Sequence, residues 1–165
     1  MELSLIVRYL VPKGVWLKRT ILLFAFIFLD YLVTIIFCKT PYAEGNLLAR
    51  SFMQTYGIVM GLTIFDLLLG IPIYGILCID SYLIKYTEQH STKAELAVDL
   101  ALGWLIAGGH FNGAASWLWN APHLMRQTLG FMIYLAIAFP SLYSPPRLSF
   151  LKSVLAPFRQ KNMEA

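Results

Sequence analysis

Long apolar runs alternate with short polar stretches along the chain. Four runs are long enough, or nearly so, to cross the roughly 30 Å hydrocarbon layer of a membrane as α-helices at about 1.5 Å per residue. These runs cover residues 20–38, 57–79, 96–117 and 128–143. The fourth run is the shortest, and its helix could begin earlier, near Met125. The pattern predicts an all-α fold, a four-helix transmembrane bundle that forms a single integral membrane domain.

The composition favours the same class of protein. Hydrophobic residues make up 58% of the 165 residues and charged residues only 13%, about half the charged share of a typical soluble domain. The mean hydropathy is +0.65. A soluble domain of this length does not need so much apolar surface, so we expect a multi-pass protein of the plasma membrane whose first partner is the lipid bilayer.

The basic residues are unevenly distributed over the connections. Ten of the 13 Lys and Arg residues lie before the first run, between the second and third runs, or after the fourth. The other three are Lys39, Arg50 and Arg126. Because cytoplasmic connections are enriched in Lys and Arg, this distribution predicts four crossings with both termini in the cytoplasm. The net charge of +4 is then explained by membrane orientation, and no nucleic-acid partner is expected.

Three segments lie outside the runs. Residues 44–56 carry apolar side chains at helical spacing, which predicts a short helix at the outer membrane surface. The basic tail, residues 144–165, could lie on the anionic cytoplasmic leaflet or be disordered. The mostly apolar stretch 2–11 could likewise be an interfacial helix or a loosely ordered end.

Acidic side chains interrupt three of the apolar runs, at Asp30, Asp66 and Asp99. A charge in the hydrocarbon layer costs roughly 2.5 to 3.5 kcal/mol, so such a group must face protein, pair, bind a cation or take up a proton. Asp30 and Asp66 fall at about the same depth, roughly 12 to 14 Å below the outer face, and His110 lies in a similar layer. Asp99 lies one turn inside the third run, where a helix N-terminus favours an anion, so we expect it to be structural.

Other polar residues extend this candidate site. Thr34 lies four residues after Asp30 and shares its helix face, and Asn112 flanks His110. We therefore treat Asp30, Asp66 and His110 as candidate catalytic residues. The candidate substrate-binding residues are Thr34, Asn46, Arg50 and Asn112.

The same layer could hold a divalent metal ion. Its ligands would be Asp30, Glu44, Asp66 and His110, since carboxylates and imidazole are common metal ligands. These groups could equally form a proton relay, or two carboxylates that share a proton. No HExxH, CxxC or His-x-His spacing points to a particular metal. A purely structural network, in which Arg50 neutralises one aspartate, explains the residues equally well.

Small residues and a proline mark the second and third runs. Gly57 and Gly61, and likewise Gly109 and Gly113, are spaced to let helix backbones approach closely. Such contacts could form within one chain, in a homo-oligomer or in a larger membrane complex. Pro72 predicts a kink in the second helix.

The first helix and its outer loop carry a motif. Asp30-x3-Thr34 followed by Glu44-x-Asn46 resembles the D-x3-T and E-x-N-P pattern of a group of small multi-pass membrane proteins of archaea and bacteria. Leu47 stands where that pattern has proline. The resemblance implies no particular activity, but it implies that these four polar residues belong to one site.

Two classes of function follow from these residues. In the first, a buried polar site opens toward the outer face and binds a cation or a polar or lipid substrate, in a carrier or a membrane-embedded enzyme. In the second, the chain is a non-catalytic accessory subunit or scaffold of a larger membrane complex, and the buried acids only fix the helix register.

Overall fold

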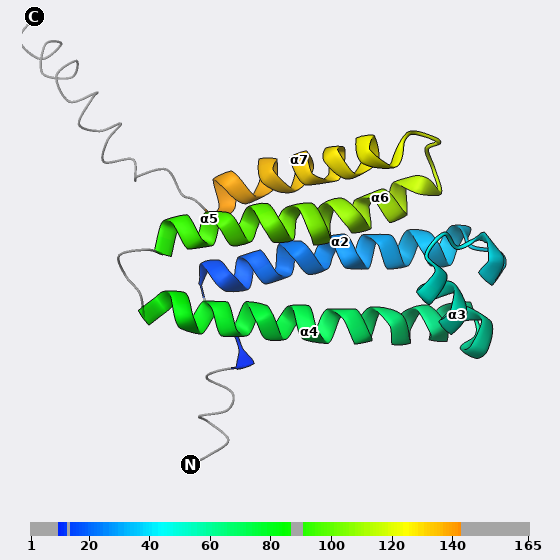
Figure 1. Cartoon of the computed structure of the whole chain (residues 1–165), viewed down its shortest axis with the longest axis horizontal. Helices are drawn as coiled ribbons and strands as arrows, with labels where there is room; N and C mark the ends of the chain where they lie inside the picture. Colours follow the sequence, from blue (N-terminus) through cyan, green and yellow to red (C-terminus); the bar gives the residue numbers. More distant parts are fainter. Residues whose placement is uncertain (1–9, 13, 87–90, 143–165) are drawn as a thin grey trace, which may run out of the picture.

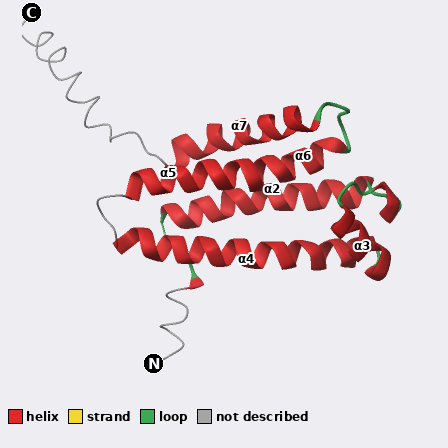
Figure 2. Cartoon of the chain, viewed as in Figure 1, coloured by secondary structure: helices red, strands yellow, loops and turns green. Residues whose placement is uncertain are grey.

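The chain is all-helical in a computed structural model that describes residues 10–12, 14–86 and 91–142, and those residues contain no strand (Figure 2). The helices are α2 (Val15–Phe37), α3 (Leu47–Tyr56), α4 (Ile58–Tyr86), α5 (Ser91–Leu102), α6 (Gly109–Ser116) and α7 (His123–Leu142), with a π-helical segment (Gly103–Gly108) joining α5 to α6. The predicted all-α class is confirmed.

The long helices lie side by side, and α3 lies across one end of them (Figure 1). The segment from α5 through α6 forms one continuous rod. This rod packs against α2 and α7, whereas α4 packs against α2 and α3 and meets the rod at α5. A space is therefore left between α4 and α6 near the α3 end of the molecule.

Each predicted membrane helix corresponds to a helix or rod of the structure, but the boundaries differ. The first begins at Val15 rather than residue 20. The second begins at Ile58 and continues to Tyr86 rather than 79, with Pro72 inside the helix. The fourth begins at His123 rather than 128. The apolar runs end at polar residues, but the helices continue through these residues.

The third predicted helix, 96–117, extends back to Ser91 in the described residues and contains the π-helical segment. A π-helical turn takes up an extra residue and changes the rotation of all later residues around the helix axis. The Gln127 side chain donates to the backbone carbonyl of Trp104 in this turn, at 3.3 Å. A Cβ added to Gly103 would lie 2.6 Å from the Tyr134 ring, so α7 packs directly on the segment.

The predicted outer helix is present as α3. Asn46 caps it, because its Oδ1 accepts from the backbone N–H groups of Leu48 and Ala49 at 3.0 and 3.3 Å. Gly57 ends it with a φ of 82°, a left-handed conformation that favours glycine. A Cβ at Gly61 would lie 2.4 Å from the Phe52 backbone, so α3 folds tightly onto α4.

A buried ion pair joins α2 to α5. Arg19 and Asp99 are 0% and 1% exposed, and Nε donates to Oδ1 at 2.5 Å while Nη2 donates to Oδ2 at 2.8 Å. The Tyr134 hydroxyl also donates to Asp99, at 2.8 Å, and the guanidinium lies 4.1 Å from the centre of the Trp16 ring. The prediction that a helix N-terminus stabilises Asp99 is wrong, because α5 begins at Ser91 and the carboxylate pairs with a residue 80 positions away.

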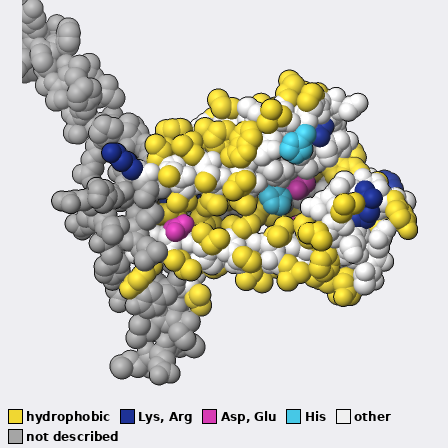
Figure 3. Space-filling view, viewed as in Figure 1, with side chains coloured by type: hydrophobic (Ala, Val, Ile, Leu, Met, Phe, Trp, Pro, Cys, Tyr) yellow, Lys and Arg dark blue, Asp and Glu magenta, His cyan; other side chains and the backbone are white. Residues whose placement is uncertain are grey.

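The outside of the molecule is largely apolar. Two helical stretches of the described chain, Val15–Phe37 and Ile58–Tyr82, are long and apolar enough to cross a membrane. Only 28% of the most apolar part of each is buried inside the protein, and the rest of its residues are half-buried or exposed. Figure 3 shows apolar side chains over much of the visible face of the described residues. Surfaces of this kind mark contact with a membrane or with another protein.

The tail 144–165 and residues 2–9 of the predicted N-terminal interfacial stretch lie outside the described residues. Several glycines pack against their own chain: Gly61 against Phe52, Gly103 against Tyr134 and Gly130 against Phe111. Association with a second copy or a larger complex therefore stays a prediction, and the contacts of these glycines do not support it.

Candidate functional site

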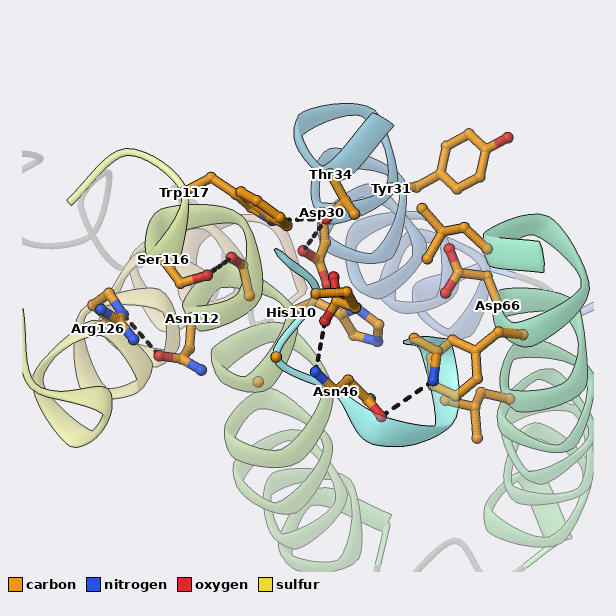
Figure 4. A pocket seen from close by; sticks show the side chains of 18 of the residues that line it. Asp30, Tyr31, Thr34, Asn46, Asp66, His110, Asn112, Ser116, Trp117 and Arg126 are labelled. Atoms are coloured by element: carbon orange, nitrogen blue, oxygen red, sulfur yellow. Dashed lines mark hydrogen bonds and ion pairs between the residues drawn. The ribbon is translucent and has the colours of Figure 1, made fainter. Parts of the chain in front are cut away.

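A cavity of about 780 Å³ lies at the α3 end of the molecule, between α4 and α6. This volume is within the usual range of small-molecule sites. Polar side chains predicted from the sequence line it: Asp30, Thr34, Glu44, Asn46, Asp66, His110 and Asn112. Figure 4 shows Asp30, Asp66 and His110 extending toward the same space from α2, α4 and α6.

The central contact of the cavity joins Asp30 of α2 to His110 of α6. The Nδ1 atom of His110 lies 2.9 Å from Oδ2 of Asp30, and the two side chains are 16% and 22% exposed. A carboxylate at Nδ1 fixes the tautomer and orientation of an imidazole ring. Among the described residues, Nε2 has no hydrogen-bond partner, so the second nitrogen is left for a group in the cavity.

Gly113 makes this contact possible. A Cβ at this position would lie 2.7 Å from both carboxylate oxygens of Asp30, which is too close for any real side chain. Gly109, one turn earlier on the same rod, has open space for 4 Å around the point where a Cβ would lie. Of this glycine pair, therefore, Gly113 admits the Asp30 carboxylate and Gly109 does not contribute to the contact.

A second chain of hydrogen bonds holds Asp30 from the other side. The indole Nε1 of Trp117 donates to Oγ1 of Thr34 at 3.1 Å, and Thr34 donates to Oδ1 of Asp30 at 3.5 Å. Thr34 is buried, with 3% exposure. Trp117 is therefore linked to the Asp30–His110 pair through one intervening hydroxyl group.

Asp66 faces the pair from α4. Its carboxylate is half-buried and has no hydrogen-bond partner among the described residues. It lies close enough to His110, Asp30 and Glu44 to interact with them electrostatically. A carboxylate in this setting needs a proton, water or a cationic group from a ligand, because the surrounding helices offer it no donor.

The loop before α3 closes the end of the cavity. Oε1 of Glu44 accepts from the Asn46 backbone N–H at 2.7 Å, and burial is the main cause that raises the pKa of Glu44, with the nearby Asp30 carboxylate adding to it. Arg50 donates through Nε and Nη2 to the backbone carbonyl of Glu44, the first at 2.8 Å. Arg50 thus braces the loop and is not among the residues that line the cavity. Its contacts support neither the predicted binding role nor the predicted neutralisation of an aspartate.

Several residues that line the cavity were missed by the sequence interpretation: Tyr31, Ser116, Trp117 and Arg126. Arg126 is the most informative. Its Nε donates to Oδ1 of Asn112 at 2.9 Å, and its Nη1 donates to the backbone carbonyls of Trp119 and Ala121. The sequence analysis treated Arg126 only as a basic residue of an outer connection. No sequence spacing indicates that it contacts Asn112.

The four predicted metal ligands, Asp30, Glu44, Asp66 and His110, all line the cavity. Within the described ranges, however, no three His, Cys, Asp or Glu side chains are grouped so that they could hold a metal ion. The divalent metal therefore stays a prediction that this geometry does not support.

Comparisons of this chain with models of protein families, with curated proteins and with solved structures found no match. The chemistry must be read from the cavity itself. The Asp30–His110 pair can accept or release a proton at Nε2 of His110, since Asp30 stabilises the imidazolium. Cys38 and Cys78 are free and do not line the cavity, so neither offers a thiol nucleophile there.

Proposed function

We propose that this protein is a multi-pass integral membrane protein of the plasma membrane, a four-helix bundle with both termini in the cytoplasm. Its outer cavity binds a polar group of a ligand, and the Asp30–His110 pair exchanges a proton with that group. The protein acts as a carrier or as a membrane-embedded enzyme. The outward-facing apolar side chains of α2 and α4 and the placement of ten of 13 basic residues on one side support the membrane location.

A contrast between two acid–base pairs carries the proposal. The Arg19–Asp99 pair is at most 1% exposed, bidentate and packed on Trp16 and Tyr134, as expected of a structural contact. The Asp30–His110 pair instead makes one contact, is 22% and 16% exposed, and faces a large cavity. Charged groups at membrane depth are costly, and a bundle that needed only packing would bury this pair as completely as the first.

The geometry assigns a role to each group. His110 accepts a proton from an O–H or N–H group of the ligand at Nε2, while Asp30 holds Nδ1 and stabilises the charged ring. Thr34 and Trp117 orient the Asp30 carboxylate. Asp66 lies across the cavity, where it can stabilise positive charge on the ligand. In a carrier the same proton exchange would couple binding to the proton gradient.

Proton uptake by the purified protein tests the proposal. The fluorescence of Trp117 is obtained by subtracting the emission of the Trp117→Phe variant from that of the wild type. This fluorescence should change with pH, because Trp117 is linked to Asp30 by hydrogen bonds. His110→Gln should abolish this titration and Asp30→Asn should shift it, while Asp80→Asn, which changes an acid of α4 outside the cavity, should leave it unchanged. A titration that persists unaltered in both cavity variants would refute the acid–base role.

Elemental analysis of the same samples tests the metal alternative. A metal present at one per chain, and lost in both Asp30→Asn and Asp66→Asn, would instead assign a metal centre and remove His110 from its role as a proton acceptor.

A further inference from the structure

The cavity has an apolar side wall as well as a polar end. Leu62, Phe65 and Leu69 line it from α4, and Leu105 lines it from the π-helical segment. Leu69 and Leu105 are also 43% and 63% exposed on the outside of the bundle. Side chains that line a cavity and also face outward form a thin wall, so the cavity approaches the lateral surface between these two leucines.

The packing of the helices explains why the cavity comes close to the lateral surface. The rod contacts α4 at α5, and α4 otherwise packs on α2 and α3. In the view of Figure 1, α2 runs between α4 and the rod, and α4 and α6 pack little against each other in the described residues. Figure 3 shows histidine and acidic side chains in a hollow of this face, with apolar side chains around it. In the proposed membrane orientation, a molecule in the hydrocarbon layer would reach the polar end between α4 and the rod without first passing through water.

The charges at the polar end of the cavity determine which polar head group a bound molecule can have. Three carboxylates line the cavity, and one of them, Asp30, is matched by His110. The guanidinium of Arg126 is already engaged by Asn112 and two backbone carbonyls. Asp66 has no donor among the described residues, and a positively charged hydrogen-bond donor on the ligand would satisfy it.

We propose that the ligand is a long-chain amine, whose ammonium group pairs with Asp66 and whose alkyl chain leaves the cavity between Leu69 and Leu105. This inference rests on the proposed function and names the ligand class and the route by which the ligand reaches the site. An ammonium group supplies the N–H donors that Asp66 lacks, and the alkyl chain keeps contact with leucine side chains and lipid. An anionic amphiphile of the same length would meet three carboxylates and be rejected.

Chain-matched probes test the inference on the full-length protein in phosphatidylcholine nanodiscs. Octadecylamine is compared with octadecanol and stearic acid, which change the head alone, and with butylamine, which keeps the head and loses the chain. Binding is followed by the fluorescence of Trp117, again defined by subtraction of Trp117→Phe. Octadecylamine should give a saturable change, and each of the other probes should bind at least about tenfold more weakly, as expected when a charge-assisted contact or chain burial is lost.

Two sets of variants locate the head and the chain. Asp66→Asn should weaken octadecylamine binding about tenfold to a hundredfold, the loss expected for a charge-assisted hydrogen bond, and Asp80→Asn should not. Leu69→Phe with Leu105→Phe narrows the side opening and should slow binding of octadecylamine but not of butylamine. Leu100→Phe is the matched control, since Leu100 is 43% exposed on the same rod and does not line the cavity.

The outcomes separate this inference from the proposed function. Equal binding of stearic acid and octadecylamine, or unchanged binding in Asp66→Asn or in the double leucine variant, would overturn the inference. If butylamine binds and octadecylamine does not, the cavity takes water-soluble amines and the lateral route is wrong, while the acid–base site stands. If no probe binds and the pH titration of Trp117 is absent, both proposals fail together.

Discussion

Replacing Asp99 by Asn keeps the shape of the side chain but removes the charge that balances Arg19. The pair is fully enclosed, with Arg19 and Asp99 at 0% and 1% exposure and two hydrogen bonds between them. No water or lipid headgroup can replace the lost carboxylate at this depth. We therefore expect Asp99→Asn to destabilise the folded bundle strongly.

The structure sets the size of the effect. Removing one partner of a buried ion pair costs about 3 to 5 kcal/mol. The asparagine oxygen can still accept one hydrogen bond, and the Trp16 ring lies 4.1 Å from the guanidinium, so the lower end of that range applies. A loss of about 3 kcal/mol corresponds to a decrease in Tm of about 6 to 12 °C for a chain of this length.

Thermal unfolding in detergent, followed by circular dichroism, measures the loss. Lys18→Gln, which removes an exposed charge next to Arg19 on the same helix, is the control and should shift Tm by less than about 2 °C, because a surface substitution costs about 0.5 kcal/mol or less. A triple variant, Arg19→Met with Asp99→Leu and Tyr134→Phe, removes every charge and hydroxyl of the cluster at once. It should recover most of the stability, because apolar residues of similar volume replace buried ion pairs at little cost.

A decrease in Tm no larger for Asp99→Asn than for Lys18→Gln would refute the assignment of Arg19 and Asp99 as an enclosed pair. A triple variant less stable than Asp99→Asn would show that the charges themselves stabilise the bundle, and would refute the view that the loss comes from a stranded cation.

Two further predictions concern the cavity. Gly113→Ala would place a Cβ 2.7 Å from the Asp30 carboxylate and should abolish the pH titration of the Trp117 fluorescence. Gly109→Ala, with open space around its Cβ, should preserve this titration. Equal behaviour of the two variants would contradict the Asp30–His110 contact. Burial raises the pKa of Glu44 in the folded state, so the folded protein holds this proton more tightly than the unfolded chain, and stability should fall as pH rises from the ordinary carboxyl pKa through the raised one. Glu44→Gln should flatten the dependence of Tm on pH above about pH 4, the ordinary carboxyl pKa, and an unchanged slope would show that Glu44 is not desolvated.

The sequence determined the helical class and the positions of the long helices. Runs such as 20–38 and 57–79 are too apolar for loops, and in a membrane a helix satisfies its own backbone groups. It also placed Asp30, Asp66 and His110 at one depth, because the rise per residue of a helix is nearly constant. Depth can therefore be calculated from residue number alone, and the structure places these three side chains around one cavity.

Rotation around the helix axis was decided only by the tertiary structure. Helices that are apolar on every side give no pattern to show which face turns inward, so neither the Arg19–Asp99 pair nor the contact of Arg126 with Asn112 could be predicted. The π-helical segment (Gly103–Gly108) changes that rotation again, without a signal in the apolar pattern. The Arg50 side chain turns to a backbone carbonyl of the loop before α3, where the acceptor lies within hydrogen-bond distance. Contacts between distant helices depend on packing of the whole bundle, and one sequence does not fix that packing residue by residue.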